Sequence, residues 1–316
     1  MNIFITGSTG YLGKKLIDKF IEYFTKNKSC KLFLLIRSPE KIPEYWRKHE
    51  NIIFISGEIN NFSIPQNITI NVMIHLASYN KNDDIEQLYK TNIEGSEHVC
   101  EIVKSNNIPK LIYLSSVSVL NGKKLNSKKK IYKNDFNYSA KDEYGKSKIE
   151  AEKIIMSYKD INKIILRSAY LYDDDKYFGT IKKRMQSLKY RIVVSEKNCV
   201  WHIAHSDLVI NLILGLAFNN TALKNDANTI VKIVADKKNI SVKSLYAEIA
   251  QNMNLKAPLF LNPFFFKTAN TLNGIIKLFL PNNIKQKFDI KNNIIAYHYS
   301  PEIYEIDQDW INNNLL

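Results

Sequence analysis

Cysteine is scarce in this chain, and long apolar runs are missing. The three cysteines, Cys30, Cys100 and Cys199, are far apart and odd in number, so they lack the close spacing of disulfide frameworks and zinc sites. The longest apolar stretches, such as 264–266 and 274–280, fall well short of the roughly 20 residues that a membrane-spanning helix needs. We therefore expect no metal site, no integral membrane segment and a reducing compartment.

We also expect neither a leader sequence nor a nucleic-acid-reading motif. Met1 runs directly into Asn2–Thr6, which reads as a buried strand, so we expect no signal peptide and a cytoplasmic location. Basic residues exceed acidic ones by 45 to 31, and six lysines lie in 123–133. That run could meet phosphates, nucleic acid or a membrane surface, although a solvated loop explains it more simply. Net charge alone does not predict a nucleic-acid partner.

Short apolar runs alternate with helical patterns through the first half of the chain. Such runs are typical of strands that are covered on both faces. The expected strands are 2–6, 32–36, 52–55, 72–76, 111–114 and 164–166, and the expected helices between them are 12–26, 85–106 and 144–159. The alternation predicts an α/β fold, namely a Rossmann-type doubly wound parallel sheet with a smaller C-terminal substrate-binding lobe.

The alternation becomes less regular in the second half, although a strand at 229–234 is expected to return to the main sheet. An aromatic, asparagine-rich tail from Pro258 shows no clear repeat. We predict an NAD(P)-binding Rossmann domain at 1–172, to which 200–236 returns, and a smaller substrate-binding lobe formed by 173–199 and 237–316.

The glycine-rich sequence TGSTGYLG at 6–13 follows an expected strand and opens an expected helix. This context is typical of a dinucleotide-binding site. Gly7 would allow the tight turn, Gly10 would let backbone N–H groups approach a pyrophosphate, and Gly13 would let the helix pack closely on the sheet. The helix N-terminus would favour the negative charge of the ligand.

Arg37 follows the second expected strand, where enzymes that use NAD usually place an acidic residue to hold the ribose hydroxyls. A guanidinium at this position would instead bind a 2′-phosphate. The sequence therefore favours NADP(H) as cofactor, with NAD(H) as the alternative.

Tyr144 and Lys148 are four residues apart on an expected helix and so project from one face. A neighbouring ammonium favours the phenolate, and moving a tyrosine pKa from 10 to about 7 takes roughly 4 kcal/mol. We therefore expect Tyr144 to exchange protons near neutral pH. Ser116 lies just beyond the expected strand 111–114, at the sheet edge where ligands bind, and its hydroxyl can orient a substrate carbonyl.

Together these residues resemble the extended short-chain dehydrogenase/reductases, specifically the NAD-dependent epimerase/dehydratase group that acts largely on nucleotide sugars. The resemblance covers most of the chain. It is carried by the glycine motif at 6–13, HLAS at 75–78, NIEG at 92–95, the serine pair at 115–116, and Tyr144 with Lys148 leading into IEAE at 149–152. Glu58 with Ile59, Arg167 and the segment HIAHSD at 202–207 also match the pattern.

The resemblance implies a role for each matching residue. Tyr144 would be the acid/base, Lys148 would bind the nicotinamide ribose and tune Tyr144, and Ser116 would bond the reacting oxygen. The cofactor would also contact Gly7, Thr9, Gly10, Tyr11, Leu12, Gly13, Arg37, Glu58, Ile59, Leu76, Ala77, Ser78 and Asn92. For His75 and Asp207 a structural role is the simpler interpretation. The resemblance also implies a homodimer.

Two departures from the family pattern bear on the substrate pocket. The segment after the serine strand reads VLNG at 119–122, where the family has valine-tyrosine-glycine, and Ser168 replaces the proline after the sixth-strand arginine. These departures leave the hydride chemistry untouched.

The leading hypothesis is an NAD(P)-dependent oxidoreductase that reduces a keto group of a nucleotide-activated sugar. The alternative is a nucleotide-sugar epimerase, or a dehydratase, with tightly bound NAD. A hydroxysteroid or other lipid-like alcohol is a further possible substrate, because the apolar tail from Phe260 could line an apolar pocket or rest on a membrane. A non-catalytic nucleotide-sensing protein is disfavoured because Tyr144 and Lys148 are both present.

Overall fold

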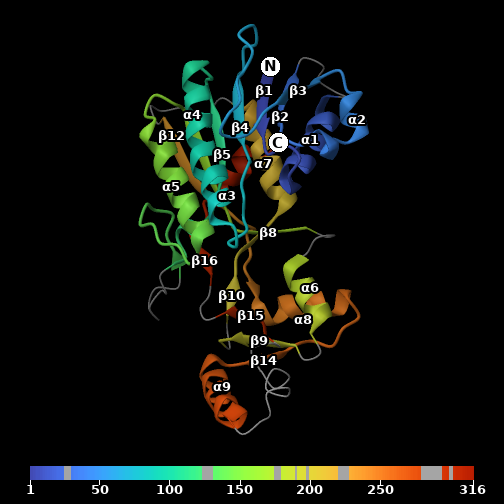
Figure 1. Ribbon diagram of the computed structural model, residues 1–316, viewed down its shortest axis with the longest axis vertical. Helices are drawn as coiled ribbons and strands as arrows, with labels where there is room; N and C mark the ends of the chain where they lie inside the picture. Colours follow the sequence, from blue (N-terminus) through green and yellow to red (C-terminus); the bar gives the residue numbers. More distant parts are fainter. Residues whose placement is uncertain are drawn as a thin grey trace.

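The computed structural model has two lobes, with a large sheet in the upper lobe and a smaller α/β lobe below it (Figure 1). It describes residues 1–24, 30–122, 131–173, 179–188, 191–196, 199–219, 228–278, 294–298 and 302–316. Most of the basic run 123–133 lies outside the described residues.

Seven strands form the main sheet in the order β3-β2-β1-β4-β5-β7-β12, and every neighbouring pair is parallel. The strands are β1 (Asn2–Thr6), β2 (Lys31–Ile36), β3 (Ile52–Ser56), β4 (Val72–His75), β5 (Leu111–Ser116), β7 (Lys163–Ser168) and β12 (Thr229–Val234). The predicted Rossmann-type α/β fold is therefore confirmed. The order reverses between β1 and β4, and ligands of such sheets bind at the carboxyl ends of the strands at this point.

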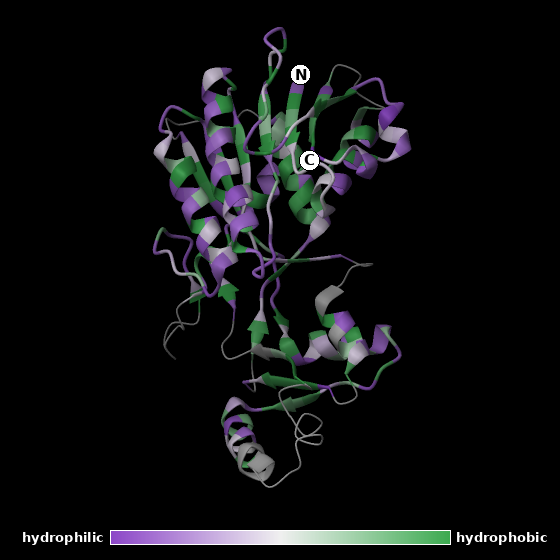
Figure 2. Ribbon diagram, viewed as in Figure 1, coloured by the Kyte–Doolittle hydropathy of each residue, from purple (hydrophilic) through white to green (hydrophobic). Residues whose placement is uncertain are grey.

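Helices cover both faces of the sheet, so apolar residues alternate between two cores. Ile3 and Ile5 of β1 belong to the core beneath α1 (Tyr11–Phe24) and α7 (Ser206–Phe218). Phe4 belongs to the core beneath α4 (Gly95–Ser105) and α5 (Glu143–Ser157). The apolar strands under helices with polar outer faces are visible in Figure 2. The remaining short elements of this lobe are η1 (Pro39–Lys41), α2 (Glu44–Arg47), α3 (Ile85–Tyr89), the π-helical turn η2 (Lys90–Glu94) and η3 (Val117–Val119).

The smaller lobe has its own apolar core, which includes Met185, Val193 and Tyr246. It contains a three-stranded sheet, β14-β9-β15, formed by β9 (Ile192–Ser195), β14 (Leu259–Leu261) and β15 (Ile294–His298). Its helices are α6 (Gly179–Ser187), α8 (Val242–Asn252) and α9 (Pro263–Leu278). Two-stranded pairings join β10 (Val200–Trp201) to β13 (Ile240–Ser241), β11 (Ile203–His205) to β8 (Tyr170–Tyr172), and β16 (Ile303–Tyr304) to β6 (Ile131–Tyr132).

The C-terminal helix α11 (Gln308–Asn314) returns to the large lobe, whereas we had assigned 237–316 to the smaller one (Figure 1). Its Ile311 is fully buried in the core beneath α7. Gly215 of α7 allows the close approach, because a Cβ there would lie 2.1 Å from the Asn314 carbonyl oxygen. In the described part of the chain, no helix has both the length and the apolar character to cross a membrane.

Candidate active site

The glycine motif forms the turn between β1 and α1. Gly7 has a φ of +73°, and a Cβ there would lie 2.5 Å from the Ala77 backbone nitrogen. A Cβ on Gly13 would lie 2.2 Å from the Gly7 carbonyl oxygen, so the first turn of α1 can pack this closely only without a side chain. Helix α1 begins at Tyr11 and continues with Leu12. The backbone N–H groups at this helix N-terminus can bind a pyrophosphate.

The residues expected near the adenosine half lie at the ends of β2 and β3. Arg37 is exposed immediately after β2. Glu58 is exposed after β3, and its carboxylate lies 3.4 Å from Lys90 Nζ. Ile59 fills the space over Gly95, where a Cβ would lie 2.8 Å from the Ile59 side chain. These positions form one edge, which offers a cation and an apolar surface to a ligand.

His75 ends β4 and is fully buried. Its ring joins Thr6 Oγ1 at 2.7 Å and Ser96 Oγ at 3.1 Å. Burial, aided by the positive charge of Lys148, lowers the pKa of His75 to about 3. The imidazole is therefore neutral, and it links β1, β4 and α4. Leu76, Ala77 and Ser78 follow it, and the Ala77 N–H donates to Thr6 Oγ1 at 3.3 Å.

Asn92 fixes the loop that follows β4. It lies in the π-helical turn η2, and its Oδ1 accepts from the Tyr79 N–H at 2.8 Å and from the Ser78 hydroxyl at 3.2 Å. Its Nδ2 donates to the Tyr79 carbonyl oxygen and to Ser147 Oγ, each at 2.9 Å. Asn92 thus ties the Ser78 loop to helix α5. The Asn92 side chain can therefore hold this loop in position.

Tyr144 lies in the first turn of α5, where Asp142 caps the helix by accepting from the Gly145 N–H at 2.9 Å. The Tyr144 side chain is half-buried, and the hydroxyls of Ser78 and Ser116 lie near enough to act on its pKa. Burial raises the pKa of Tyr144, and the two serine hydroxyls oppose that rise. The structure therefore brings together a phenol and two hydroxyls from the ends of β4 and β5. The partner hydroxyl of Ser78 was not foreseen from the sequence.

Lys148 lies one turn further along α5 and is buried. Its ammonium donates to Tyr113 Oη at 3.1 Å and to the Leu114 carbonyl oxygen at 3.0 Å. Burial lowers the pKa of Lys148 to about 7, although the Glu152 carboxylate opposes this shift. In this structure burial raises the pKa of Tyr144, and the Lys148 ammonium is bonded to β5, so an effect of Lys148 on the Tyr144 pKa stays a prediction.

A buried ion pair supports the strand that carries Ser116. Arg167 Nη2 of β7 lies 2.7 Å from Glu152 Oε2 of α5, and both side chains are completely buried. Ser115 donates to Glu152 Oε1 at 2.5 Å, and the Tyr138 hydroxyl donates to Oε2 at 2.9 Å. The sequence signal for the buried position of Glu152 is that it lies four residues after Lys148, on the same helix face.

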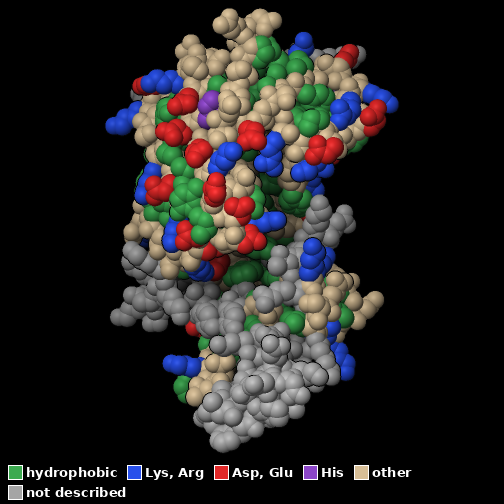
Figure 3. Space-filling model, viewed as in Figure 1, with side chains coloured by type: hydrophobic (Ala, Val, Ile, Leu, Met, Phe, Trp, Pro, Cys, Tyr) green, Lys and Arg blue, Asp and Glu red, His purple; other side chains and the backbone are tan. Residues whose placement is uncertain are grey.

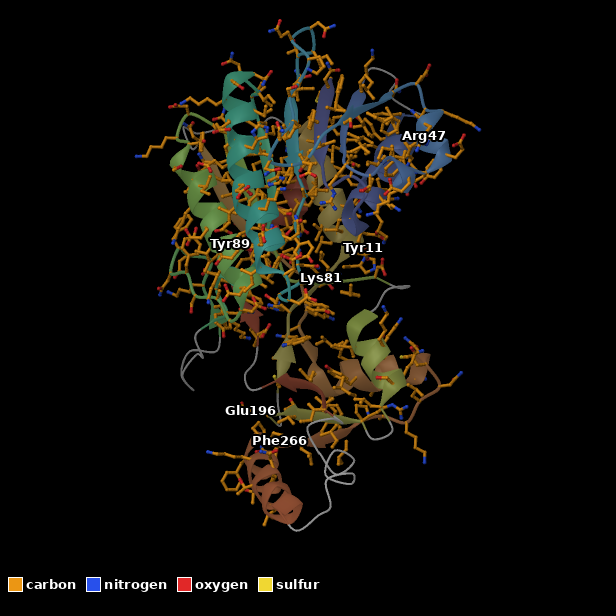
Figure 4. The ribbon with its side chains drawn as sticks, viewed as in Figure 1. Tyr11, Arg47, Lys81, Tyr89, Glu196 and Phe266 are labelled. Atoms are coloured by element: carbon orange, nitrogen blue, oxygen red, sulfur yellow. The ribbon has the colours of Figure 1, made fainter. Side chains whose placement is uncertain are left out.

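A second polar cluster joins the glycine turn to the region between the lobes. Tyr11 donates to the buried carboxylate of Asp173, and burial together with this bond raises the pKa of Tyr11. Lys15 Nζ lies 3.1 Å from Asp173 and 3.4 Å from Asp207, and it donates to Ser206 Oγ at 2.8 Å. Figure 4 shows Tyr11 at the edge of the large lobe that faces the small one. No spacing in the sequence predicted the Asp173 contact.

Comparison with known proteins places this geometry in a family. Residues 4–214 match the 3-beta hydroxysteroid dehydrogenase/isomerase family. The chain is 22% identical over 274 residues to an N-acetyl-alpha-D-glucosaminyl-diphospho-ditrans,octacis-undecaprenol 4-epimerase of Escherichia coli, which covers 83% of this chain and 76% of that protein. It is 27% identical over 186 residues to the UDP-glucose 4-epimerase of Vibrio cholerae, and this match covers 54% of this chain and 52% of that protein.

Among solved structures, the UDP-glucuronic acid 4-epimerase of Bacillus cereus in complex with NAD has the same fold. The TM-score is 0.62 at 21% identity, over 83% of this chain and 88% of that one. Membership of one family thus explains the strand order, the glycine turn and the tyrosine-lysine helix together. The chain belongs to the 3-beta hydroxysteroid dehydrogenase/isomerase family and is an NAD(P)-dependent oxidoreductase/epimerase of the extended short-chain dehydrogenase/reductase type.

Proposed function

We propose that this protein is an NAD-dependent epimerase that inverts a hydroxyl-bearing carbon of a nucleotide-linked sugar. The observation that carries the proposal is the convergence of Tyr144, Ser78 and Ser116 at the ends of β4 and β5, in a chain whose similarity to a sugar 4-epimerase extends over 83% of its length. Ketoreduction, our leading hypothesis from the sequence, has less support, because the named relatives are epimerases.

The residues present fit a nicotinamide dinucleotide. The N-terminus of α1, reached through Gly7 and Gly10, would bind the pyrophosphate. Arg37, Glu58 and Ile59 would contact the adenosine half, and Leu76, Ala77, Ser78 and Asn92 would hold the chain near the nicotinamide half. When bound, the cofactor supplies a reversible hydride acceptor, which lets the sugar carbon be oxidised and then restored.

The side chains of the site can perform the accompanying proton transfer. Tyr144 would take the proton of the sugar hydroxyl and later return it, and Ser116 would hold the sugar oxygen. Lys148 would place positive charge beside the Tyr144 phenol once a ribose hydroxyl competes with Tyr113 for its ammonium. Asn92 would act as a positioning residue, because it fixes the loop that carries Ser78.

Oxidation of a steroid-like alcohol is the second candidate function, and the family match over residues 4–214 favours it. The same Tyr144, Lys148 and Ser116 would serve that reaction. The two candidates differ in turnover: an epimerase restores its own cofactor, whereas a steroid dehydrogenase releases reduced cofactor in proportion to the product.

The first experiment is mass spectrometry of the nucleotide that is released when the protein is denatured. We expect this nucleotide to be NAD. The purified protein should then convert UDP-glucose, UDP-N-acetylglucosamine or UDP-glucuronic acid to an epimer, detected by NMR, without net change in absorbance from NADH. Tyr144→Phe should lower turnover by about 100-fold or more. Tyr89→Phe removes a hydroxyl from the neighbouring helix surface, 3.4 Å from Glu143, and should preserve turnover.

Three results would contradict the proposal. Stoichiometric consumption of NADPH with a keto sugar would restore the reductase hypothesis. Stoichiometric NADH formation with a hydroxysteroid would favour the second candidate. Full activity of the Tyr144→Phe variant would remove the proposed acid/base.

A further inference from the structure

Helix α9 lies at the end of the small lobe that is farthest from the main sheet (Figure 1). It is attached to the three-stranded sheet through the buried Phe266, which packs with Ile192, Val194 and Ile294. Figure 4 shows Phe266 where α9 meets the lobe. This attachment fixes which face of the helix is turned inward.

The outward face of α9 carries large apolar side chains. Phe264 is 73% exposed, Phe265 is 66% exposed and Leu272 is 55% exposed. At 100° per residue, these three positions fall within about 100° of one another around the helix, and Phe266 lies outside that arc. The two exposed rings contact each other edge to face, with centroids 5.8 Å apart. A contiguous exposed aromatic patch of this kind marks an interaction surface.

Helix α9 and the chain segment that leads to it are positively charged. Helix α9 contains Lys267 and Lys277 and no acidic residue, and residues 237–278 contain six lysines against one glutamate. Lysine and arginine side chains are also visible on the described part of the small lobe (Figure 3). A second copy of the chain would bring like charges together at this face. A surface of anionic lipid headgroups complements both the positive charge and the exposed aromatic rings.

We propose that α9 docks onto the surface of an anionic bilayer through Phe264, Phe265 and Leu272, with Lys267 meeting the lipid headgroups. The helix would lie in the plane of the interface, with its apolar side chains at the boundary between headgroups and acyl chains. Because α9 is at the far end of the small lobe, the glycine turn and Tyr144 in the large lobe would stay clear of the membrane. This proposal is independent of the sugar substrate.

The test is co-sedimentation of the full chain with vesicles of phosphatidylcholine alone and of phosphatidylcholine with phosphatidylglycerol. The wild-type protein should sediment with the anionic vesicles and stay in solution with the neutral ones. The Phe264→Ser/Phe265→Ser variant should lose on the order of tenfold in partitioning. Lys267→Glu, which leaves the aromatic rings in place, should also weaken binding, and binding should fall as salt is raised.

The matched control is Ile85→Ser/Leu316→Ser, which removes two apolar side chains of the large lobe that are 51% and 58% exposed. It should bind anionic vesicles as the wild type does, and circular dichroism of every variant shows whether it is folded. Failure of the wild type to sediment, equal binding to neutral vesicles, or unchanged binding of the aromatic variant would overturn the proposal. So would a dimer, measured by light scattering without lipid, that only the aromatic variant dissociates.

Discussion

Burial disfavours charge on both central side chains of the candidate site. It raises the pKa of the Tyr144 phenol, and it lowers the pKa of the Lys148 ammonium to about 7. A neutral Tyr144 phenol and a Lys148 whose pKa is lowered toward neutrality suit a site in which a proton moves in both directions. The same physical effect keeps His75 neutral, although that ring has only structural partners.

The neutrality of His75 predicts a loss of stability in acid. An unfolded histidine binds a proton below about pH 6.5, whereas the folded protein keeps this ring neutral down to about pH 3. The unfolded state therefore binds more protons in this window, and the free energy of unfolding should fall by about 1.4 kcal/mol per pH unit as the pH drops through it. Urea unfolding between pH 4 and 7 should show a shallower slope for His75→Asn. His49→Gln, at a half-buried ring near the surface, should keep the wild-type slope.

We predict that Arg37 sets how the protein discriminates between phosphorylated and unphosphorylated cofactors. Its exposed guanidinium at the end of β2 can form charge-assisted hydrogen bonds with a 2′-phosphate. Arg37→Ala should therefore weaken NADPH binding about tenfold and leave NADH binding nearly unchanged. Fluorescence titration of the nucleotide-free protein measures both. An equal loss for the two cofactors would assign Arg37 to the adenine instead.

Helix α5 organises the candidate site at the scale of one element. Its residues Tyr144, Lys148 and Glu152 follow at four-residue steps, so they share the face that meets β5. Tyr144 meets Ser116, Lys148 meets the Leu114 carbonyl oxygen, and Glu152 meets Ser115. One capped helix thereby sets the distances among these side chains.

The buried pair between α5 and β7 should be the most sensitive contact of this element. Arg167→Met would leave the Glu152 carboxylate buried without its cation, which costs about 3–5 kcal/mol of the free energy of unfolding. Lys153→Met breaks an exposed pair with Glu150 on the same helix and should cost less than about 1 kcal/mol. Urea denaturation compares the two. Similar losses would show that Glu152 finds another partner.

At the scale of the whole molecule, the Asp173 cluster couples the end of β8 to the first turns of α1. Tyr11 follows Gly10 directly, and Lys15 lies one turn further along α1. Both bond to Asp173, which follows Tyr172 at the end of β8, toward the small lobe. This contact would hold the glycine turn in place beneath a bound pyrophosphate.

Loss of that contact should loosen the cofactor. Asp173→Asn removes the charge that bonds both Tyr11 and Lys15, and we expect nucleotide affinity to fall by about five- to tenfold. Asp207→Asn removes the more exposed partner of Lys15 and should have a smaller effect. The nucleotide content of the purified proteins and the dissociation rate of added NADH measure this. Unchanged retention in Asp173→Asn would make the cluster purely structural.

Much of the fold could be predicted because its signals are local. Strands buried on both faces must be continuously apolar, and Gly7 and Gly13 mark a turn that no side chain permits. The spacing of Tyr144 and Lys148 likewise placed them on one helix face. Their catalytic roles, the domain limits other than the placement of α11, a homodimer and a cytoplasmic location stay predictions.

The sequence by itself determined the α/β class, the family and the positions of the glycine turn and the tyrosine-lysine helix, because each depends on residues close together in the chain. Only the tertiary structure decided that Ser78 meets Tyr144, that Lys148 bonds to β5, that Asp173 meets Tyr11, and that α11 returns to α7. The Tyr11–Asp173 contact joins residues that are 162 positions apart in the sequence. At the ends of α7 and α11, the hydrogen bond between Asn219 and Asn314 joins residues that are 95 positions apart. Such contacts depend on how the packed helices and strands bring distant side chains together, and no local spacing records that.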